Sequence, residues 1–92
     1  MNGDILVTII LLSYNAERYI IEALQSIKMQ NHPKIELIII DDCSQDNTVN
    51  LEKEWLKDNG NIFTNTKLIA QRKTMELWQI QIWDLNIQMA II

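Results

Sequence analysis

Two short runs of apolar and mostly β-branched residues stand out along the chain, and polar residues follow each run directly. The first run covers residues 7–12 (Val-Thr-Ile-Ile-Leu-Leu), and the second covers residues 35–40 (Ile-Glu-Leu-Ile-Ile-Ile). Runs without regular polar alternation are typical of strands that are covered on both faces of a parallel sheet. We therefore predict a buried strand in each run, with a polar loop at its carboxyl end.

The segment between these runs has the spacing of an amphipathic helix. Asn15 is a candidate N-cap, and apolar residues recur at helical spacing as far as about Met29. They are Ile20, Ile21, Ala23, Leu24 and Ile27. Pro33 ends the helical region, because proline lacks a backbone N–H and disfavours helix at the residue before it. The order strand, helix, strand predicts a right-handed βαβ unit whose strands end at the same edge of the sheet.

A second helix is predicted after the second run, from about Thr48 to Lys57. Ser44 or Asp46 can cap its start, and the turn-forming residues 58–61 end it. The apolar residues available for its buried face are Val49, Leu51, Trp55 and Leu56. The chain therefore continues the alternation of strands and helices that is typical of an α/β fold.

The remaining sequence has a weaker pattern. Residues 62–63 and 67–70 suit either a short third strand or a hairpin broken at residues 64–65. Residues 72–92 can be drawn as a helix, but their apolar residues fall all round the helical wheel. Such a segment is either buried on every side or not a natural structural element.

Composition bounds the class of protein. The 92 residues are 48% hydrophobic and 22% charged, which suits one small globular domain. A net charge of −4 and eight scattered basic residues argue against a nucleic-acid partner. The single Cys43 excludes an intrachain disulfide, and we expect a cytoplasmic protein because no signal peptide or spanning segment is visible. Association with a membrane surface is not readable from the sequence.

The polar residues after the two strands carry a family resemblance. Residues 13–15 are Ser-Tyr-Asn, and residues 41–48 are Asp-Asp-Cys-Ser-Gln-Asp-Asn-Thr. They resemble the opening of family 2 glycosyltransferases, which have the GT-A nucleotide-diphosphosugar-binding fold. The resemblance covers roughly residues 5–56. It implies a Rossmann-like α/β unit, βαβ(αβ), with parallel strands, as the incomplete N-terminal part of a GT-A domain.

The resemblance also implies a division of the chain and a function. Residues 5–70 would be the nucleotide-binding half of a GT-A domain, and residues 71–92 an atypical tail. The expected partner is a nucleotide-diphosphosugar, a UDP-sugar, whose sugar a complete family member transfers to an acceptor. A complete member uses a divalent metal, Mn²⁺ or Mg²⁺, held by an Asp-x-Asp motif, and a downstream carboxylate base. This chain has neither, so we expect no catalytic residue, no metal and no cofactor within it, and no activity alone.

The family positions that contact the nucleotide map onto six residues: Leu12, Tyr14, Asn15, Glu17, Asp41 and Asp42. The resemblance makes Asp42 the acceptor for the imide N–H of uracil and turns Asp41 toward the structural side of its loop. The alternative is that both carboxylates only cap the following turn and helix. Tyr14 offers an aromatic face for the base, or else is a core tyrosine. Glu17 lies near the nucleoside, or is simply an acid in the first turn of a helix.

The sequence departs from the family pattern at Cys43 and after residue 71. Cys43 replaces a frequent glycine, which allows a positive φ more freely than cysteine does. The motifs expected after residue 71 are missing, yet back-translating Thr74 onward with AT-rich codons and shifting the frame yields two Asn-x-Gly-like signals and a Gly-x-Tyr. We therefore hypothesise a frameshifted tail.

Other functions remain open at this stage. One is a non-enzymatic nucleotide-binding remnant or a pseudogene product. Another is a different doubly wound α/β domain, such as a flavodoxin-like receiver. An incomplete sheet would also leave apolar strand residues exposed on one side or the other, and Ile9, Leu11, Ile38 and Ile40 are the expected ones.

Overall fold

The computed structural model describes residues 5–30, 32–71 and 87–91 of the chain. Its elements are β1 (Val7–Ser13), α1 (Ile20–Lys28), β2 (Ile35–Asp42), α2 (Thr48–Asn59), the 3₁₀ turn η2 (Gly60–Ile62), β3 (Asn65–Gln71) and β4 (Ile87–Ile91). The strands form one sheet in the order β3-β2-β1-β4, and every neighbouring pair is parallel. The predicted α/β fold with parallel strands is confirmed.

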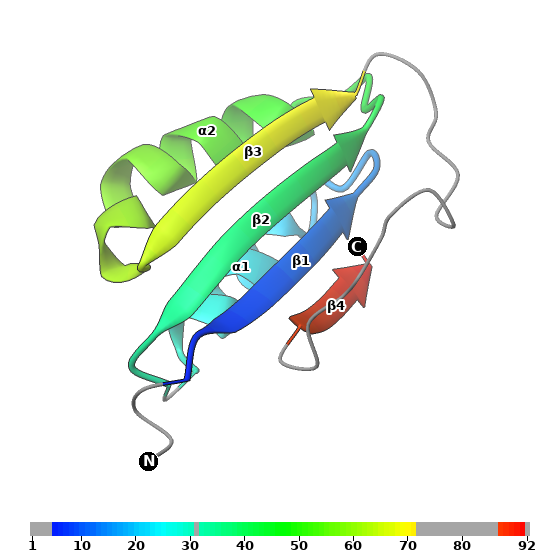
Figure 1. Cartoon of the computed structure of the whole chain (residues 1–92). Helices are drawn as coiled ribbons and strands as arrows, with labels where there is room; N and C mark the ends of the chain where they lie inside the picture. The colour runs from blue at the N-terminus through cyan, green and yellow to red at the C-terminus, as the bar shows by residue number, and fades with distance from the viewer. Residues whose placement is uncertain (1–4, 31, 72–86, 92) are drawn as a thin grey trace.

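Both helices cover the same face of the sheet, and β1, β2 and β3 end at the same edge (Figure 1). This arrangement follows from the connections, because the chain moves in one direction from β1 through β2 to β3 and crossovers have a fixed hand. The register pairs Ser13 with Asp41 at the carboxyl ends of β1 and β2. The polar residues that follow the two strands are therefore brought together.

The main core lies between the sheet and the two helices. Its buried residues are Ile9, Leu11, Ala16, Ile20, Leu24, Ile27, Ile35, Leu37, Ile39, Trp55 and Phe63. The predicted exposure of Ile9 and Leu11 is wrong, because these side chains point to the helices and are 2% and 0% exposed.

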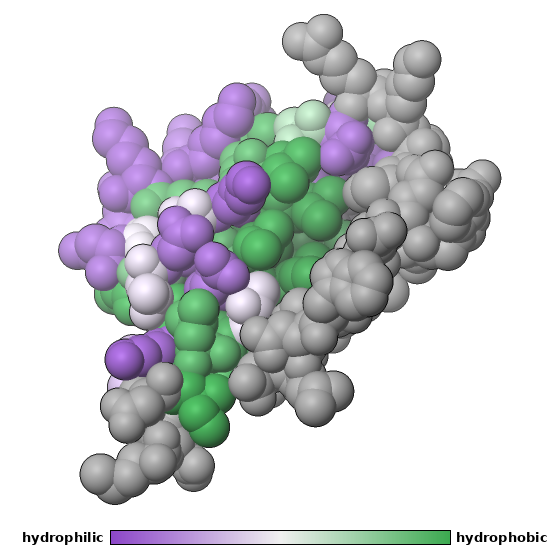
Figure 2. Space-filling view, in the orientation of Figure 1, coloured by the Kyte–Doolittle hydropathy of each residue, from purple (hydrophilic) through white to green (hydrophobic). Residues whose placement is uncertain are grey.

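A second apolar cluster lies on the opposite face, which we call the open face. It contains buried Ile10, Leu12 and Ile40 and the partly buried Ile38 and Ile69. The predicted exposure holds only in part for this face, since Ile38 is half-buried whereas Ile40 is 7% exposed. Figure 2 looks onto the open face and shows a hydrophobic area bordered by hydrophilic residues.

The helix α1 begins later than predicted. The carbonyl oxygen of Ala16 accepts hydrogen bonds from the N–H groups of Tyr19 and Ile20 at 2.9 and 2.8 Å, which forms a turn before the helix. Asn15 is not the N-cap, because it lies in the loop with a φ of 45° and bonds elsewhere. The loop between β1 and α1 is consequently longer than the sequence indicated.

The helix α2 also differs from the prediction. It extends to Asn59, and its buried residues are Thr48, Glu52 and Trp55. Of the four residues predicted to be inside, only Trp55 is fully buried, while Leu51 and Leu56 pack at the margin of the core and Val49 is half-buried. Two polar side chains therefore occupy the inner face of the first turns of α2.

The segment after α2 forms a strand and not a hairpin. Residues 60–62 make the 3₁₀ turn, and the Thr64 N–H donates to the Ile35 carbonyl at 2.8 Å before β3 pairs with β2.

The described part of the tail forms a strand. Residues 87–91 form β4 beside β1, which corrects the helical interpretation for that part of the tail. The frameshift hypothesis falls mainly on residues 72–86 and 92, which lie outside the described residues. None of the helices described is long and apolar enough to span a membrane.

Candidate functional site

Two loops meet at the carboxyl edge of the sheet, where open α/β sheets bind their ligands. One loop connects β1 to α1, and the other connects β2 to α2. The N–H of Asn15 in the first loop donates to Ser44 Oγ in the second at 2.8 Å. In return, the N–H of Gln45 donates to Asn15 Oδ1 at 2.8 Å. We call these two joined loops the rim.

A second reciprocal pair of hydrogen bonds closes the other end of the rim. The N–H of Glu17 donates to Asp46 Oδ2 at 3.2 Å, and the N–H of Asn47 donates to Glu17 Oε2 at 3.1 Å. Burial raises the pKa of Asp46, but hydrogen bonds from Thr48 and from the Glu17 N–H outweigh this effect and hold the pKa below its ordinary value. Asp46 is therefore a charged acceptor that ties the rim to the start of α2.

The carboxylate of Asp41 is turned inward. Its side chain is 1% exposed, and it accepts hydrogen bonds from Ser13 Oγ at 3.0 Å, from the Ser44 N–H at 2.9 Å and from Ser44 Oγ. These donors hold the turn that follows β2. Asp41 is therefore a buried acceptor that supports the rim from behind.

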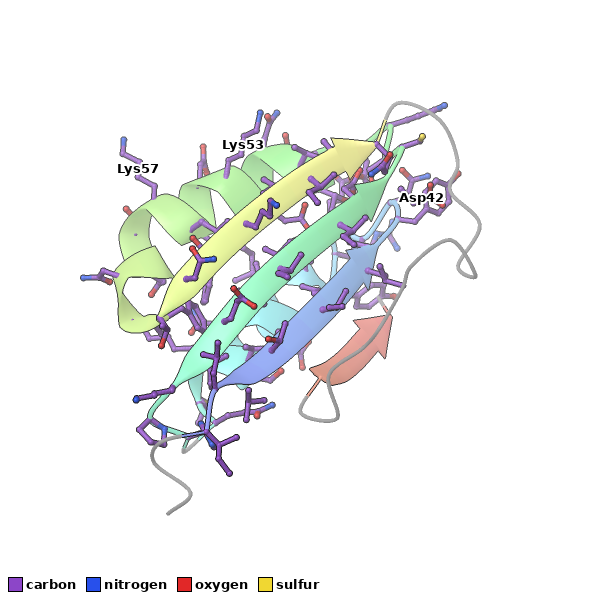
Figure 3. All side chains as sticks on the ribbon, in the orientation of Figure 1. Asp42, Lys53 and Lys57 are labelled. Carbon is purple, nitrogen blue, oxygen red and sulfur yellow. The ribbon has the colours of Figure 1, made fainter. Side chains whose placement is uncertain are left out.

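Asp42 and Leu12 lie together on the open face. Successive side chains of a strand point to opposite faces, so Asp42 points away from Asp41 and continues the row of Ile40. Leu12 pairs with Ile40 in the register and belongs to the same apolar cluster. Asp42 is half-buried at the carboxyl edge of the sheet (Figure 3).

Tyr14 and Cys43 are the first residues after β1 and β2. Tyr14 follows β1 directly and is 57% exposed, which rules out the alternative of a core tyrosine. Cys43 follows β2 with a φ of 64°, so the loop keeps the left-handed conformation that glycine would favour. The rim thus has the backbone path expected for the family motif despite the cysteine.

The sequence analysis missed Glu52 in α2. Its side chain is fully buried, and its Oε2 lies 2.8 Å from Ser13 Oγ. Burial raises the pKa of Glu52 to about 7, and the nearby charges of Asp41 and Asp46 act in the same direction. The spacing of Thr48, Glu52 and Trp55 at i, i+4 and i+7 was the available signal.

Thr48 is the other polar residue of α2 that sequence reasoning did not assign. Its Oγ1 accepts a hydrogen bond from the Ala16 N–H at 2.8 Å and donates to Asp46 Oδ1. The first residue of α2 therefore anchors the loop that follows β1. Across residues 5–30, 32–71 and 87–91 no group of three or more His, Cys, Asp or Glu is placed to hold a metal ion.

Comparison with known proteins identifies the family of this chain. The profile of the family described as Glycosyl transferase family 2 matches residues 8–74, a range that contains both loops. The chain belongs to glycosyl transferase family 2. The resemblance drawn from residues 13–15 and 41–48 is confirmed.

Relatives in family 2 cover the same part of the chain. TuaG of Bacillus subtilis (strain 168), named for teichuronic acid biosynthesis, is 44% identical over 56 residues, which are 61% of this chain and 22% of TuaG. The poly(ribitol-phosphate) beta-N-acetylglucosaminyltransferase TarS of Staphylococcus aureus (strain Mu50 / ATCC 700699) is 38% identical over 50 residues, which are 52% of this chain and 9% of TarS.

A solved family 2 structure shares the fold. The crystal structure of S. aureus TarS 1–349 in complex with UDP superposes with a TM-score of 0.63 at 30% identity. The match covers 76% of this chain and 20% of the TarS chain. The matched part of this chain thus spans 22% of TuaG, 9% of TarS and 20% of the TarS chain in the crystal structure.

Proposed function

We propose that this chain binds the nucleotide part of a nucleotide-diphosphosugar, with UDP as the nucleotide, at the carboxyl edge of β1 and β2. The observation that carries the proposal is the rim, in which four reciprocal hydrogen bonds join the two loops. A rim fixed in advance loses little conformational entropy when a ligand binds. The proposal is supported by the similar TarS structure, which is a complex with UDP.

Three residues would face the nucleoside. Asp42 accepts the imide N–H of uracil in a charge-assisted hydrogen bond, because its carboxylate lies at the open-face end of β2. Tyr14 follows Ser13, and Asp42 follows Asp41, the register partner of Ser13. Tyr14 is exposed there and offers its ring to the face of the base. The side chain of Leu12 is only 7% exposed, so Leu12 would contribute through its backbone near the end of β1.

The other three candidate residues would act on the rim and not on the ligand. The N–H and side-chain oxygen of Asn15 are both engaged by the loop after β2. Glu17 is engaged in the same way, and Asp41 accepts three hydrogen bonds behind the rim. Their role in nucleotide binding is therefore to position the two loops.

Transfer of the sugar is proposed only for a longer protein of this family, in which a divalent metal and a catalytic base come from residues outside the described ones. The binding step of this chain rests on the base edge, so we expect Mn²⁺ to change its affinity for UDP little. An affinity that depended strongly on Mn²⁺ would point to metal ligands outside the described residues.

Calorimetry of UDP binding to Asp42→Asn tests the proposal. An asparagine keeps the shape but loses the charge-assisted acceptor, so we expect affinity to fall at least about tenfold, or about 1.5 kcal/mol. The matched control is Asp58→Asn, since Asp58 is exposed near the end of α2, away from the rim. Equal affinities for the two variants would reject Asp42 as the base acceptor, and no UDP binding by the unaltered chain would reject the function.

A further inference from the structure

Behind the rim, a hydroxyl group lies between two buried carboxyl groups. Ser13 Oγ is 3.0 Å from Asp41 Oδ1 and 2.8 Å from Glu52 Oε2. The three side chains come from β1, β2 and α2 and are 2%, 1% and 0% exposed. Solvent therefore cannot compensate a mismatch of hydrogen-bond donors and acceptors among them.

Counting hydrogens shows that two ionised carboxylates do not satisfy this arrangement. A serine hydroxyl has one hydrogen, so Ser13 can donate to Asp41 or to Glu52 but not to both. With both groups ionised, one carboxylate oxygen would face the hydroxyl oxygen with no hydrogen between them. A proton on one carboxyl group resolves the conflict, because that group then donates to Ser13 while Ser13 donates to the other.

The surroundings decide which carboxyl group holds the proton. Asp41 already accepts donors from Ser44 in addition to Ser13. Glu52 has only Ser13, and its Oε1 has no hydrogen-bond partner in the described part of the chain. Burial and the negative charges of Asp41 and Asp46 raise the pKa of Glu52 to about 7, although the hydrogen bond with Ser13 acts to lower it. Glu52 is therefore the group that is protonated below about pH 7.

Within the described part of the chain, three groups act on the Glu52 carboxyl group. They are the Ser13 hydroxyl from β1, Asp41 from β2 and Asp46 from the loop before α2. The lysines of α2 do not offset these charges, since Lys53 and Lys57 project away from the sheet (Figure 3). Both lysines are exposed to solvent.

We propose that Glu52 is a positioning residue: its protonated carboxyl group donates to Ser13 Oγ, directs the Ser13 hydroxyl hydrogen to Asp41, and so fixes the end of β2, where Asp42 lies. When Glu52 loses this proton, the Ser13 hydrogen turns to Glu52 and Asp41 loses a donor. The end of β2 and the turn in which Ser44 bonds to Asp41 are then held less firmly. The link to nucleotide affinity rests on the proposed function, whereas the proton arrangement does not.

Carboxyl carbon NMR of the full chain tests the proton arrangement without a ligand. We expect the Glu52 signal, assigned by its loss in Glu52→Gln, to titrate near pH 7, and the Ser44 amide shift to follow it. The amide of Glu52→Gln can donate to Ser13 permanently, so its Ser44 signal should not respond in this range. Glu54→Gln, which changes an exposed residue of the same helix, should behave like the unaltered chain.

A second variant separates positioning from simple burial. Ser13→Ala removes the bridge, so Glu52 should still titrate with a raised midpoint while the Ser44 amide no longer follows it. A Glu52 midpoint near 4.5, or a Ser44 response that survives Ser13→Ala, would overturn the proposal.

Affinity for UDP between about pH 5.5 and 8.5 tests the consequence for the site. The ratio of the affinity of Glu52→Gln to that of the unaltered chain removes the titration of the UDP phosphates, which is common to both. We expect this ratio to rise about three- to tenfold across pH 7 and the same ratio for Glu54→Gln to stay constant. A constant ratio for Glu52→Gln would overturn the positioning role. Absence of UDP binding at every pH would instead reject the proposed function, while the NMR titration would still decide the proton arrangement.

Discussion

At the residue scale, Cys43 shows how a family motif keeps its shape after losing its glycine. The sequence predicted strain at this position, because a positive φ costs conformational energy for a residue that has a Cβ atom. In the structure Cys43 adopts a φ of 64°, and Ser44 beside it makes two hydrogen bonds to Asp41. These bonds hold a backbone conformation that costs an L-residue about 1–2 kcal/mol.

Replacing Cys43 with glycine should therefore stabilise the protein. Glycine removes the strain of the left-handed conformation but loses more backbone entropy on folding, so we expect a net gain of about 0.5–1 kcal/mol in the free energy of unfolding. Cys43→Ala is the control, because alanine keeps the strain. Urea denaturation measures both variants, and a glycine variant no more stable than the alanine variant would contradict the strain argument.

The residue scale also shows what the sequence could predict about the site. Asp41 and Asp42 were recognisable because a buried run ends at them. Their opposite orientations follow from strand alternation, and the register places Ser13 beside Asp41. The spacing of Thr48, Glu52 and Trp55 put them on one face of α2, but the sequence of the helix did not show that this face, and not the apolar one, meets the strand ends.

At the element scale, α2 is oriented by its polar contacts as much as by its apolar residues. Apolarity alone predicted that Val49 and Leu56 face inward, yet the buried residues are Thr48, Glu52 and Trp55. Thr48 anchors the first turn to Ala16 and Asp46, and Trp55 packs on Phe63 with ring centroids 6.0 Å apart. The contact between Thr48 and Ala16 joins residues 32 positions apart, so no local pattern contained it.

The buried acid of α2 should make stability depend on pH. The folded-state pKa of Glu52 is raised from 4.5 to about 7, so its contribution is fully present below about pH 4.5 and is lost as pH rises through 7. The difference amounts to about 3 kcal/mol. Glu52→Gln should lack this loss and be more stable than the unaltered chain at pH 8. Urea denaturation at several pH values measures it, and a parallel pH dependence in both proteins would show that another group is responsible.

At the scale of the whole molecule, the order of the strands could be predicted from the sequence only for the strongly apolar strands. The βαβ unit of β1, α1 and β2 was predicted because both strands are buried runs. The pattern of β3 is weaker because most of its residues lie partly or fully exposed at an outer position of the sheet. The strand β4 escaped prediction because its pairing with β1 joins residues far apart in the chain.

A charged residue should have a different effect on each face of this sheet. Two neighbouring residues of β3, one on each face, allow the comparison. Ile69 belongs to the apolar cluster of the open face, whereas Leu68 packs against the core beneath the helices. Both side chains are half-buried, so their starting exposure is of the same class. We expect the apolar area of the open face to promote self-association of the chain, because exposed apolar surface next to a sheet edge favours contact between molecules.

Ile69→Lys should reduce this self-association at a cost of less than about 1 kcal/mol in stability, since the lysine stem can lie along the sheet while its charge reaches water. Leu68→Lys should instead destabilise the protein by about 2 kcal/mol or more, because it puts a charge against the core between sheet and helices. Sedimentation velocity and urea denaturation measure the two effects. If both variants lost stability equally, the open face would be packed as tightly as the helix face, and its apolar residues would be part of the core.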